Sequence, residues 1–253
     1  MSCKIFVMTH KKYWMPTDDV YQPLLVGSAL RKDFIGLESY QYDNIGASLS
    51  VKNKNYCELT GLYWVWKNTD YDVVGLVHYR RYFSLNARAK REAILSREQI
   101  EKLMEKTDLV LPRKRHYYIE TVSSQYEHAH HKQDLICTRN IIQQVCPDYL
   151  SDYDAIMKER SLYLYNMFIA QKPLIDSYCS WLFSILEEVE KQLDISTYTD
   201  NDKRVFGFLS ERLFNVWIHH QNITIKEIPL CNLENQHWAG KILNFVKRKM
   251  TKK

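Results

Sequence analysis

The chain has 253 residues, of which 45% are hydrophobic, which is enough for one large α/β domain or two small ones. The formal net charge is +5 at pH 7, which suits an anionic ligand or an anionic membrane surface and gives no reason to expect nucleic acid. Six scattered cysteines form no CxxC pair, and Lys4 interrupts the short N-terminal apolar run, so we expect a reduced, cytoplasmic protein without a zinc ribbon, disulfide framework or signal peptide.

Apolar runs and a capping signal organise the first third of the chain. The run CKIFVMTH, residues 3–10, predicts a first strand that ends in a polar loop. Asn55, followed three residues later by Glu58, resembles a capping box and predicts a helix that stops near Asn68. A strand buried on both faces should follow, and it ends in the polar stretch GLVHYRRYF, residues 75–83.

A second capping signal, Ser96 with Gln99, opens the next predicted helix, and TDLVLP, residues 107–112, predicts the strand after it. Strand, helix and strand at this spacing indicate a βαβ unit in a parallel sheet. Residues 113–134 show no clean periodicity and are rich in polar and aromatic side chains, which favours a long functional loop.

The second half of the chain carries two strongly amphipathic helical patterns between strand signals. The predicted elements are a strand and turn in 161–173, helices in 173–194 and 203–220, and a late strand in 223–229. No internal repeat or linker divides the chain. The sequence therefore predicts one α/β domain with a mostly parallel central sheet flanked by helices, spanning 1–235, and a basic amphipathic tail, 236–253.

Two predicted strand ends carry chemistry that an ordinary core strand lacks. In open α/β sheets, ligands bind at the carboxyl ends of the strands, and arginine supplies bidentate contacts to phosphate. The sequence thus favours a nucleotide-diphosphate pocket, although the arginines could instead be solvated or structurally paired. The residues concerned are Thr9, His10 and Lys11 after the first strand, and His78, Tyr79, Arg80 and Arg81 after the other.

Several other chemistries lose support. No GxxxxGK[ST], GxGxxG or GxSxG pattern stands where a kinase, dinucleotide-binding protein or α/β-hydrolase needs it. A metal site at His128, His130, His131 and Asp134 is a weak signal, because these spacings do not aim every side chain one way. Glu211 lies on the polar side of its predicted helix and is a candidate general base, unless it only pairs with its neighbour Arg212.

Five long segments together resemble a bacterial capsular and exopolysaccharide biosynthesis family catalogued as domain of unknown function 4422. The resemblance spans roughly 4 to 220, and the family in turn is similar to glycosyltransferases of the GT-A type. The segments are FVMTHKKYWMP, ASLSVKNKNYCELTGLYWVWKN, YDVVGLVHYRRYF, YNMFIAQKPLIDSYCSWLFSILEEVEK and RVFGFLSERLFNVWI.

The resemblance implies a GT-A-like fold and a glycosyltransferase, in effect a hexosyltransferase, that moves a sugar from a UDP-linked donor to a growing capsular, exopolysaccharide or O-antigen glycan. Some members are assigned as galactofuranosyltransferases, which makes galactofuranose a candidate sugar. Most GT-A enzymes hold a divalent metal with an Asp-x-Asp motif where this chain has His78-Tyr79-Arg80-Arg81. We therefore expect cations to replace the metal, and Mn²⁺ or Mg²⁺ is an option that the sequence does not require.

Further site residues follow from the matched positions. Lys52 and Asn53 should approach the nucleotide or donor sugar, and Glu211 should be the base of an inverting transfer. The predicted sugar and acceptor pocket consists of Glu58, Tyr126, His130, Asp134 and Asn166. For Glu58, the simpler interpretation as a helix cap remains open.

The basic C-terminal tail favours a location at a membrane surface. Basic residues surround apolar ones in 239–253, and such a helix can lie on an anionic bilayer, where lipid-linked acceptors are found. A solvated or frayed chain end is the alternative. Two other functions stay open: a non-catalytic protein that binds a nucleotide sugar or glycan on the same scaffold, and a phosphate-ester enzyme that uses the histidine-rich region and a metal.

Overall fold

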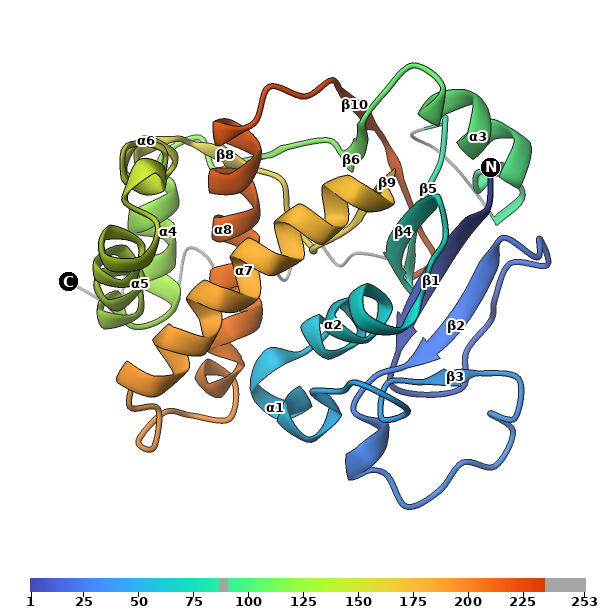
Figure 1. The fold of residues 1–253 in the computed structure, drawn as a ribbon, viewed down its shortest axis with the longest axis horizontal. Coiled ribbons are helices and arrows are strands. Elements are labelled where there is room, and N and C mark those ends of the chain that lie inside the picture. The colour runs from blue at the N-terminus through green and yellow to red at the C-terminus, as the bar shows by residue number, and fades with distance from the viewer. Residues whose placement is uncertain (87–90, 235–253) are drawn as a thin grey trace.

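The computed structural model describes residues 1–86 and 91–234, and it is built around one large sheet (Figure 1). Within these residues the sheet has nine strands, and its main path runs β10-β6-β9-β4-β1-β2-β3. The strands are β1 Cys3–Thr9, β2 Tyr21–Leu25, β3 Gln41–Tyr42, β4 Val73–His78, β5 Arg81–Phe83, β6 Leu109–Pro112, β9 Phe168–Gln171, β10 Ile225–Ile228 and β11 Leu230–Asn232. A separate two-stranded sheet pairs β7, Arg115–His116, with β8, Ser161–Leu162.

Strand direction confirms the predicted fold class. Along the main path every strand except β9 points the same way, because β9 is antiparallel to both of its neighbours, β4 and β6. The predicted βαβ unit therefore has its strands in the expected direction, but β4 and β6 are not adjacent: β9 lies between them. A strand from much later in the chain fills the gap, which the local pattern could not show.

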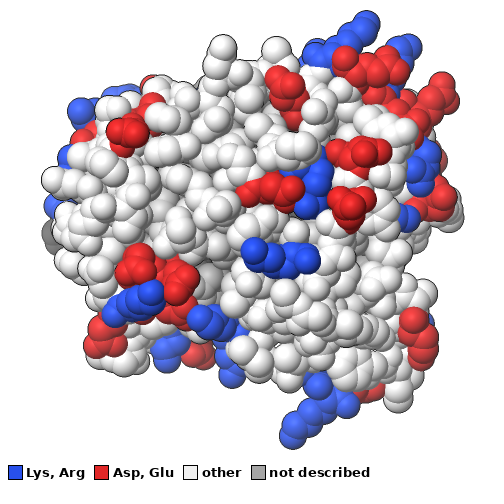
Figure 2. Space-filling model, in the orientation of Figure 1, with Lys and Arg blue, Asp and Glu red and all other residues white. Residues whose placement is uncertain are grey.

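Helices cover the sheet on both faces. In Figure 1, α7 and α2 cross the front of the sheet, and α4, α5 and α6 gather beyond α8 on the left. The helices are α1 Asn53–Tyr56, α2 Leu59–Asn68, α3 Arg97–Met104, α4 Val122–Ala129, α5 Lys132–Val145, α6 Leu150–Lys158, α7 Lys172–Gln192 and α8 Val205–His220. Figure 2 shows acidic and basic side chains in mixed groups on this front face, with a broad uncharged area to the left of its centre.

Alternation along the strands explains why the sheet is buried on both sides. In β1, Phe6 and Met8 join the core under α2, α7 and α8, while Ile5 and Val7 face the opposite core. Successive side chains of a strand point to opposite faces, so an uninterrupted apolar run such as CKIFVM is what a doubly covered strand requires. The buried-strand predictions for 3–10 and for the run before His78 are confirmed.

Two local predictions need correction. The predicted helix ends at Asn68 as expected, but it begins only at Leu59, because the chain is interrupted at Cys57, whose φ of 53° lies in the left-handed region, and the Asn55–Glu58 capping box does not form. The segment 113–134 is not a long loop, because a Thr121–Ser124 capping box starts α4 within it. In contrast, the capping box of Ser96 with Gln99 is present at the start of α3.

Candidate functional site

The carboxyl ends of β1 and β4 lie side by side, as the sequence predicts. The two strands are parallel neighbours, and Met8 is in register with His78. Their following residues therefore emerge together at one edge of the sheet, which we call the carboxyl edge. After His78 the chain does not run on as a loop: Tyr79 and Arg80 form a tight turn, and Arg81 begins β5 opposite His78.

Four side chains gather around this turn. The rings of His10 and Tyr79 meet edge to face at 5.3 Å, while Lys11 Nζ and the Arg80 guanidinium lie 5.6 and 4.8 Å from the Tyr79 ring centre. Arg80 also forms an ion pair with Glu234, with 2.9 Å between its Nη1 and Oε2. Burial, together with the charges of Lys11 and Arg80, lowers the pKa of His10 below its usual value. These groups bring two cations, Lys11 and Arg80, to the edge, one of them paired with Glu234.

Arg81 is held differently from Arg80. Its guanidinium lies 4.4 Å from the centre of the Tyr165 ring, a cation–π arrangement. Its Nε is buried and has no hydrogen-bond partner in 1–86 and 91–234. A buried donor without a partner is uncommon in folded proteins and needs an explanation, such as a missing ligand.

The chain reaches the same edge again just before β9. Because β9 runs antiparallel to β4, with Phe168 opposite Leu76, its first residues lie where β4 ends. Here Tyr165 and Asn166 both have positive φ angles, 79° and 50°. Two successive non-glycine residues in this region cost free energy, and such strain concentrates at functional sites.

The Tyr165–Asn166 turn connects three charged or titratable side chains. His78 donates from Nε2 to the Tyr165 carbonyl oxygen at 2.7 Å. The Tyr165 amide donates to Glu211 Oε1 at 2.8 Å, and Asn166 Nδ2 donates to Glu58 Oε1 at the same distance. Residues from β4, α8 and the start of α2 thus meet at one turn, which the pattern of the sequence did not reveal.

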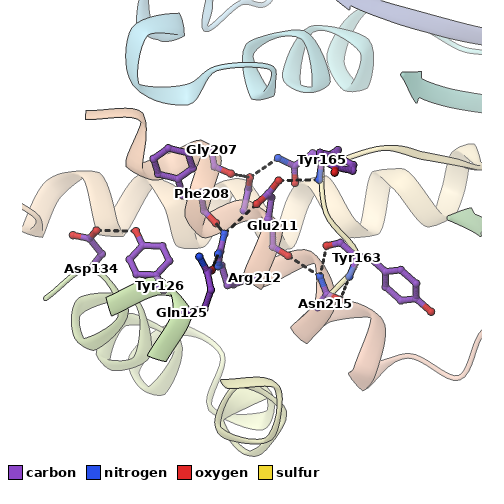
Figure 3. Close-up of polar contacts among 12 residues, drawn as sticks. Gln125, Tyr126, Asp134, Tyr163, Tyr165, Gly207, Phe208, Glu211, Arg212 and Asn215 are labelled. Carbon is purple, nitrogen blue, oxygen red and sulfur yellow. Dashed lines mark hydrogen bonds and ion pairs between the residues drawn. The ribbon is translucent and has the colours of Figure 1, made fainter. Parts of the chain in front are cut away.

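Glu211 points from α8 toward Tyr165 (Figure 3). Its Oε2 accepts from Arg212 Nη1 at 3.0 Å, and the Arg212 side chain, only 5% exposed, also donates to Gln125 Oε1 at 3.0 Å. Burial raises the pKa of Glu211, while Arg212 and the Tyr165 amide act against that rise and the charge of Glu58 adds to it. The pairing of Glu211 with Arg212 is therefore present, and its role as general base stays a prediction.

His78 gives the site a measurable pH dependence. Burial lowers the pKa of His78, Glu58 opposes that change, and Arg81 and Arg80 add to it. Below about pH 6.5 His78 takes up a proton in the unfolded chain but stays neutral in the native chain. The free energy of unfolding should therefore be at its full value above about pH 6.5 and should fall as the pH drops below it. In urea unfolding between pH 7.5 and 5.5, we expect His78→Gln to lose part of this slope, at most about 1.4 kcal/mol per pH unit. Identical slopes in both proteins would contradict the assignment.

Lys52 and Asn53 lie beside the start of α2 and make structural contacts. Lys52 Nζ is 2.6 Å from Glu190 Oε2, and Asn53 Nδ2 donates to the Cys57 carbonyl oxygen and to Thr60 Oγ1. Their predicted approach to the nucleotide remains a prediction.

Tyr126 and Asp134 are buried, and the Tyr126 hydroxyl donates to Asp134 Oδ2 at 2.7 Å. His130 stacks on Phe208 at 4.1 Å and binds Asp202 through Nδ1. These three side chains serve the packing of α4, α5 and α8, and their place in the sugar or acceptor pocket stays a prediction.

The side chains of the histidine-rich segment are divided between two carboxylates. His128 contacts Glu120, whereas His130 and His131 both contact Asp202. In residues 1–86 and 91–234, no group of three or more His, Cys, Asp or Glu side chains is placed to hold a metal ion.

Sequence reasoning missed Asp43, which organises the loops beside the site. This carboxylate is fully buried and accepts from the Gly27 amide, the Ser28 amide and hydroxyl, and Thr60 Oγ1, at 2.6 to 3.0 Å, as well as from Ser50 Oγ. It joins the segment after β2 to α2. An aspartate between polar neighbours gives no sequence signal for such a role.

The described part of the chain has no helix that is both long enough and apolar enough to span a bilayer. The basic tail predicted to lie on a membrane, 236–253, falls outside the described residues.

Comparison with known proteins gives two matches. The model of a family described as Domain of unknown function (DUF4422) matches residues 4–222. The apo structure of the WbbM bifunctional glycosyltransferase is similar in fold, with a TM-score of 0.86 and 30% sequence identity. That match covers 93% of this chain and 46% of the WbbM chain, so this chain spans about half the length of its structural relative. No curated protein sequence matches.

Proposed function

The chain belongs to the DUF4422 family, and from this premise we propose that it is a glycosyltransferase that moves a sugar from a UDP-linked donor to a growing bacterial surface glycan. The similarity to a bifunctional glycosyltransferase over 93% of the chain supports the reaction class. The site supports it independently, because nucleotides bind at the carboxyl edge of such sheets. Galactofuranose is the sugar we propose, and transfer with inversion would then give a β-linkage.

One observation carries the proposal: cations and hydrogen-bond donors gather where β1 and β4 end together. Arg81 has a buried Nε without a partner among the described residues, and the cationic groups of Arg80 and Lys11 lie 4.8 and 5.6 Å from the centre of the Tyr79 ring. A leaving diphosphate gains negative charge as the sugar departs, and positioned cations stabilise that charge. Lys11, Arg80 and Arg81 thus offer positive charge and N–H donors where we propose that the diphosphate binds.

A divalent metal fits this place poorly. Metals of this kind prefer several carboxylate oxygens, whereas β4 ends in His78 and is followed by Tyr79, Arg80 and Arg81. Glu234 and Glu211 are paired with Arg80 and Arg212, so among these two and Glu58 only Glu58 Oε2 has no partner in the described residues. We therefore route no step through a metal. The cationic side chains take over the neutralisation of the diphosphate, and a carboxylate of the site accepts the proton of the acceptor hydroxyl.

The acceptor is proposed to be a lipid-linked glycan at the inner face of the cell membrane. A protein bound there would work at the cytoplasmic surface, and the basic segment 239–253 would supply the contact to anionic lipid. Binding to vesicles with and without anionic lipid tests this part separately from the chemistry.

The function is tested by a donor screen. The purified chain is incubated with each UDP-sugar and a glycan acceptor, while released UDP and the mass of the acceptor are measured. We expect one donor to release UDP and lengthen the acceptor by one sugar. Protection of the chain against thermal unfolding by a UDP-sugar, with no turnover on any acceptor offered, would contradict the enzyme and favour a binding protein.

A further inference from the structure

The two carboxylates of the site are held in different ways. Glu211 has both oxygens engaged, by the Tyr165 amide and by Arg212. Arg212 is itself buried, so it needs the opposite charge of Glu211 close by. Glu58 is half-buried, only its Oε1 is engaged, and none of the described residues donates a hydrogen bond to its Oε2.

The amide of Asn166 is fixed in one orientation. Ser210 donates its hydroxyl proton to the Gly207 carbonyl oxygen, and therefore accepts from Asn166 Nδ2. The same Nδ2 donates to Glu58 Oε1, so a turned amide would place two acceptors, Oδ1 and Oε1, against each other. This chain of bonds always presents an N–H to Glu58 Oε1 and fixes the position of the carboxylate.

The two residues that place Glu58, Asn166 and Cys57, both have a strained backbone. Asn166 is only 4% exposed, its Oδ1 is buried without a hydrogen-bond partner in the described chain, and its backbone is left-handed. On the other side of Glu58, Cys57 also has a positive φ. Strain at both residues that place one carboxylate is costly and is expected where geometry matters for function.

We propose that Glu58 is the catalytic base of the transfer, that Asn166 is the residue that positions it, and that Glu211 supports the turn rather than taking the proton. This assignment rests on the proposed function. It differs from the sequence-based expectation that Glu211 is the base. Two observations support it: Glu58 Oε2 accepts no hydrogen bond from the described residues, and the fixed amide of Asn166 holds Oε1.

The proposed step balances as a single displacement. The acceptor hydroxyl oxygen attacks the anomeric carbon, and the bond from that carbon to the diphosphate oxygen breaks, with its electron pair going to the UDP leaving group. The proton of the hydroxyl moves to Glu58 Oε2. Arg80 lies in the turn after β4 and Arg81 begins β5, at the edge where the charge of the departing diphosphate needs neutralising.

The test compares Glu58→Gln with Glu211→Gln, and uses Glu101→Gln on α3 as a matched control far from the edge. Glutamine keeps the acceptor for Asn166 but cannot take a proton. We expect Glu58→Gln to lose kcat by about 100-fold or more with UDP affinity within about 3-fold of wild type. Glu211→Gln should lose thermal stability and keep a kcat at least about 10-fold above that of Glu58→Gln.

The positioning role has its own readout. Asn166→Gly tolerates the left-handed backbone and removes the whole side chain, with its contact to Glu58. Without that contact Glu58 is no longer held in place, so kcat should fall by about 10-fold or more while KM for the donor stays within about 3-fold of the wild-type value. A purely structural Asn166 would lower the stability and leave kcat of the folded variant unchanged.

The results distinguish a failure of the proposed function from a failure of the assignment of Glu58 as the base. No UDP release by the wild-type chain with any donor and acceptor contradicts the proposed function, and this assignment with it. Turnover by wild type that survives in Glu58→Gln contradicts the assignment alone. So does a Glu211→Gln variant that binds UDP normally, stays folded and loses turnover instead.

Discussion

Replacing Asp43 with alanine is expected to destabilise the fold by about 3–5 kcal/mol, a large share of the stability of an ordinary domain. The change leaves the buried amides of Gly27 and Ser28 and the hydroxyls of Ser50 and Thr60 without their acceptor. Each unsatisfied buried group costs about 1–3 kcal/mol, and neighbouring costs do not simply add. Urea unfolding followed by circular dichroism measures the difference.

Asp33→Ala is the matched control for this change. Asp33 also accepts a backbone amide, that of Ile35, but it does so at the exposed surface. Its loss should cost less than about 1 kcal/mol, since water replaces the missing partner. If Asp43→Ala unfolds within 1 kcal/mol of the wild-type chain, Asp43 does not hold these loops together.

Replacing Arg81 with alanine should weaken UDP binding by about 10- to 100-fold, which corresponds to the loss of one or two hydrogen bonds to a charged group. The arginine has a buried Nε without a partner in the described chain and is held over Tyr165, so little ordering is needed before it binds. Arg80 must first exchange Glu234 for the ligand, and Arg80→Ala should therefore have the smaller effect. Isothermal titration calorimetry with UDP measures both.

Arg97→Ala makes the same change of charge at the other end of β1, where Arg97 contacts the Cys3 carbonyl oxygen and Asp19. It should bind UDP like the wild-type chain. Arg81→Ala with normal affinity, or with affinity lost only together with cooperative unfolding, would show that Arg81 is a structural residue.

Strand positions and the meeting of two strand ends could be predicted from the sequence because both depend on local patterns. An uninterrupted apolar run marks β1 and β4, and parallel neighbours necessarily bring Lys11 and His78 to one edge. The insertion of β9 between β4 and β6 could not be predicted, because its pairing joins Phe168 to Leu76 across most of a hundred residues. The sequence of neither segment alone indicates that the two strands pair.

The connection between Glu58 and Glu211 could not be predicted from the sequence either. Glu58 and Glu211 were each singled out, but their connection runs through Tyr165 and Asn166, which belong to neither helix. Asparagine tolerates the left-handed backbone, so Asn166 carried a faint signal, whereas a tyrosine with positive φ carries none. Glu58 looked like part of a helix cap because its spacing from Asn55 fitted one, but the left-handed Cys57 ended that helix first.

Cationic side chains at the carboxyl edge should bind the donor diphosphate without a metal. A calorimetric titration of the wild-type chain and Arg81→Ala with UDP, in buffer that contains EDTA, measures this. We expect the wild-type chain to bind UDP under these conditions and Arg81→Ala to bind it about 10- to 100-fold more weakly. Binding that is abolished by EDTA and restored by Mn²⁺ would contradict it.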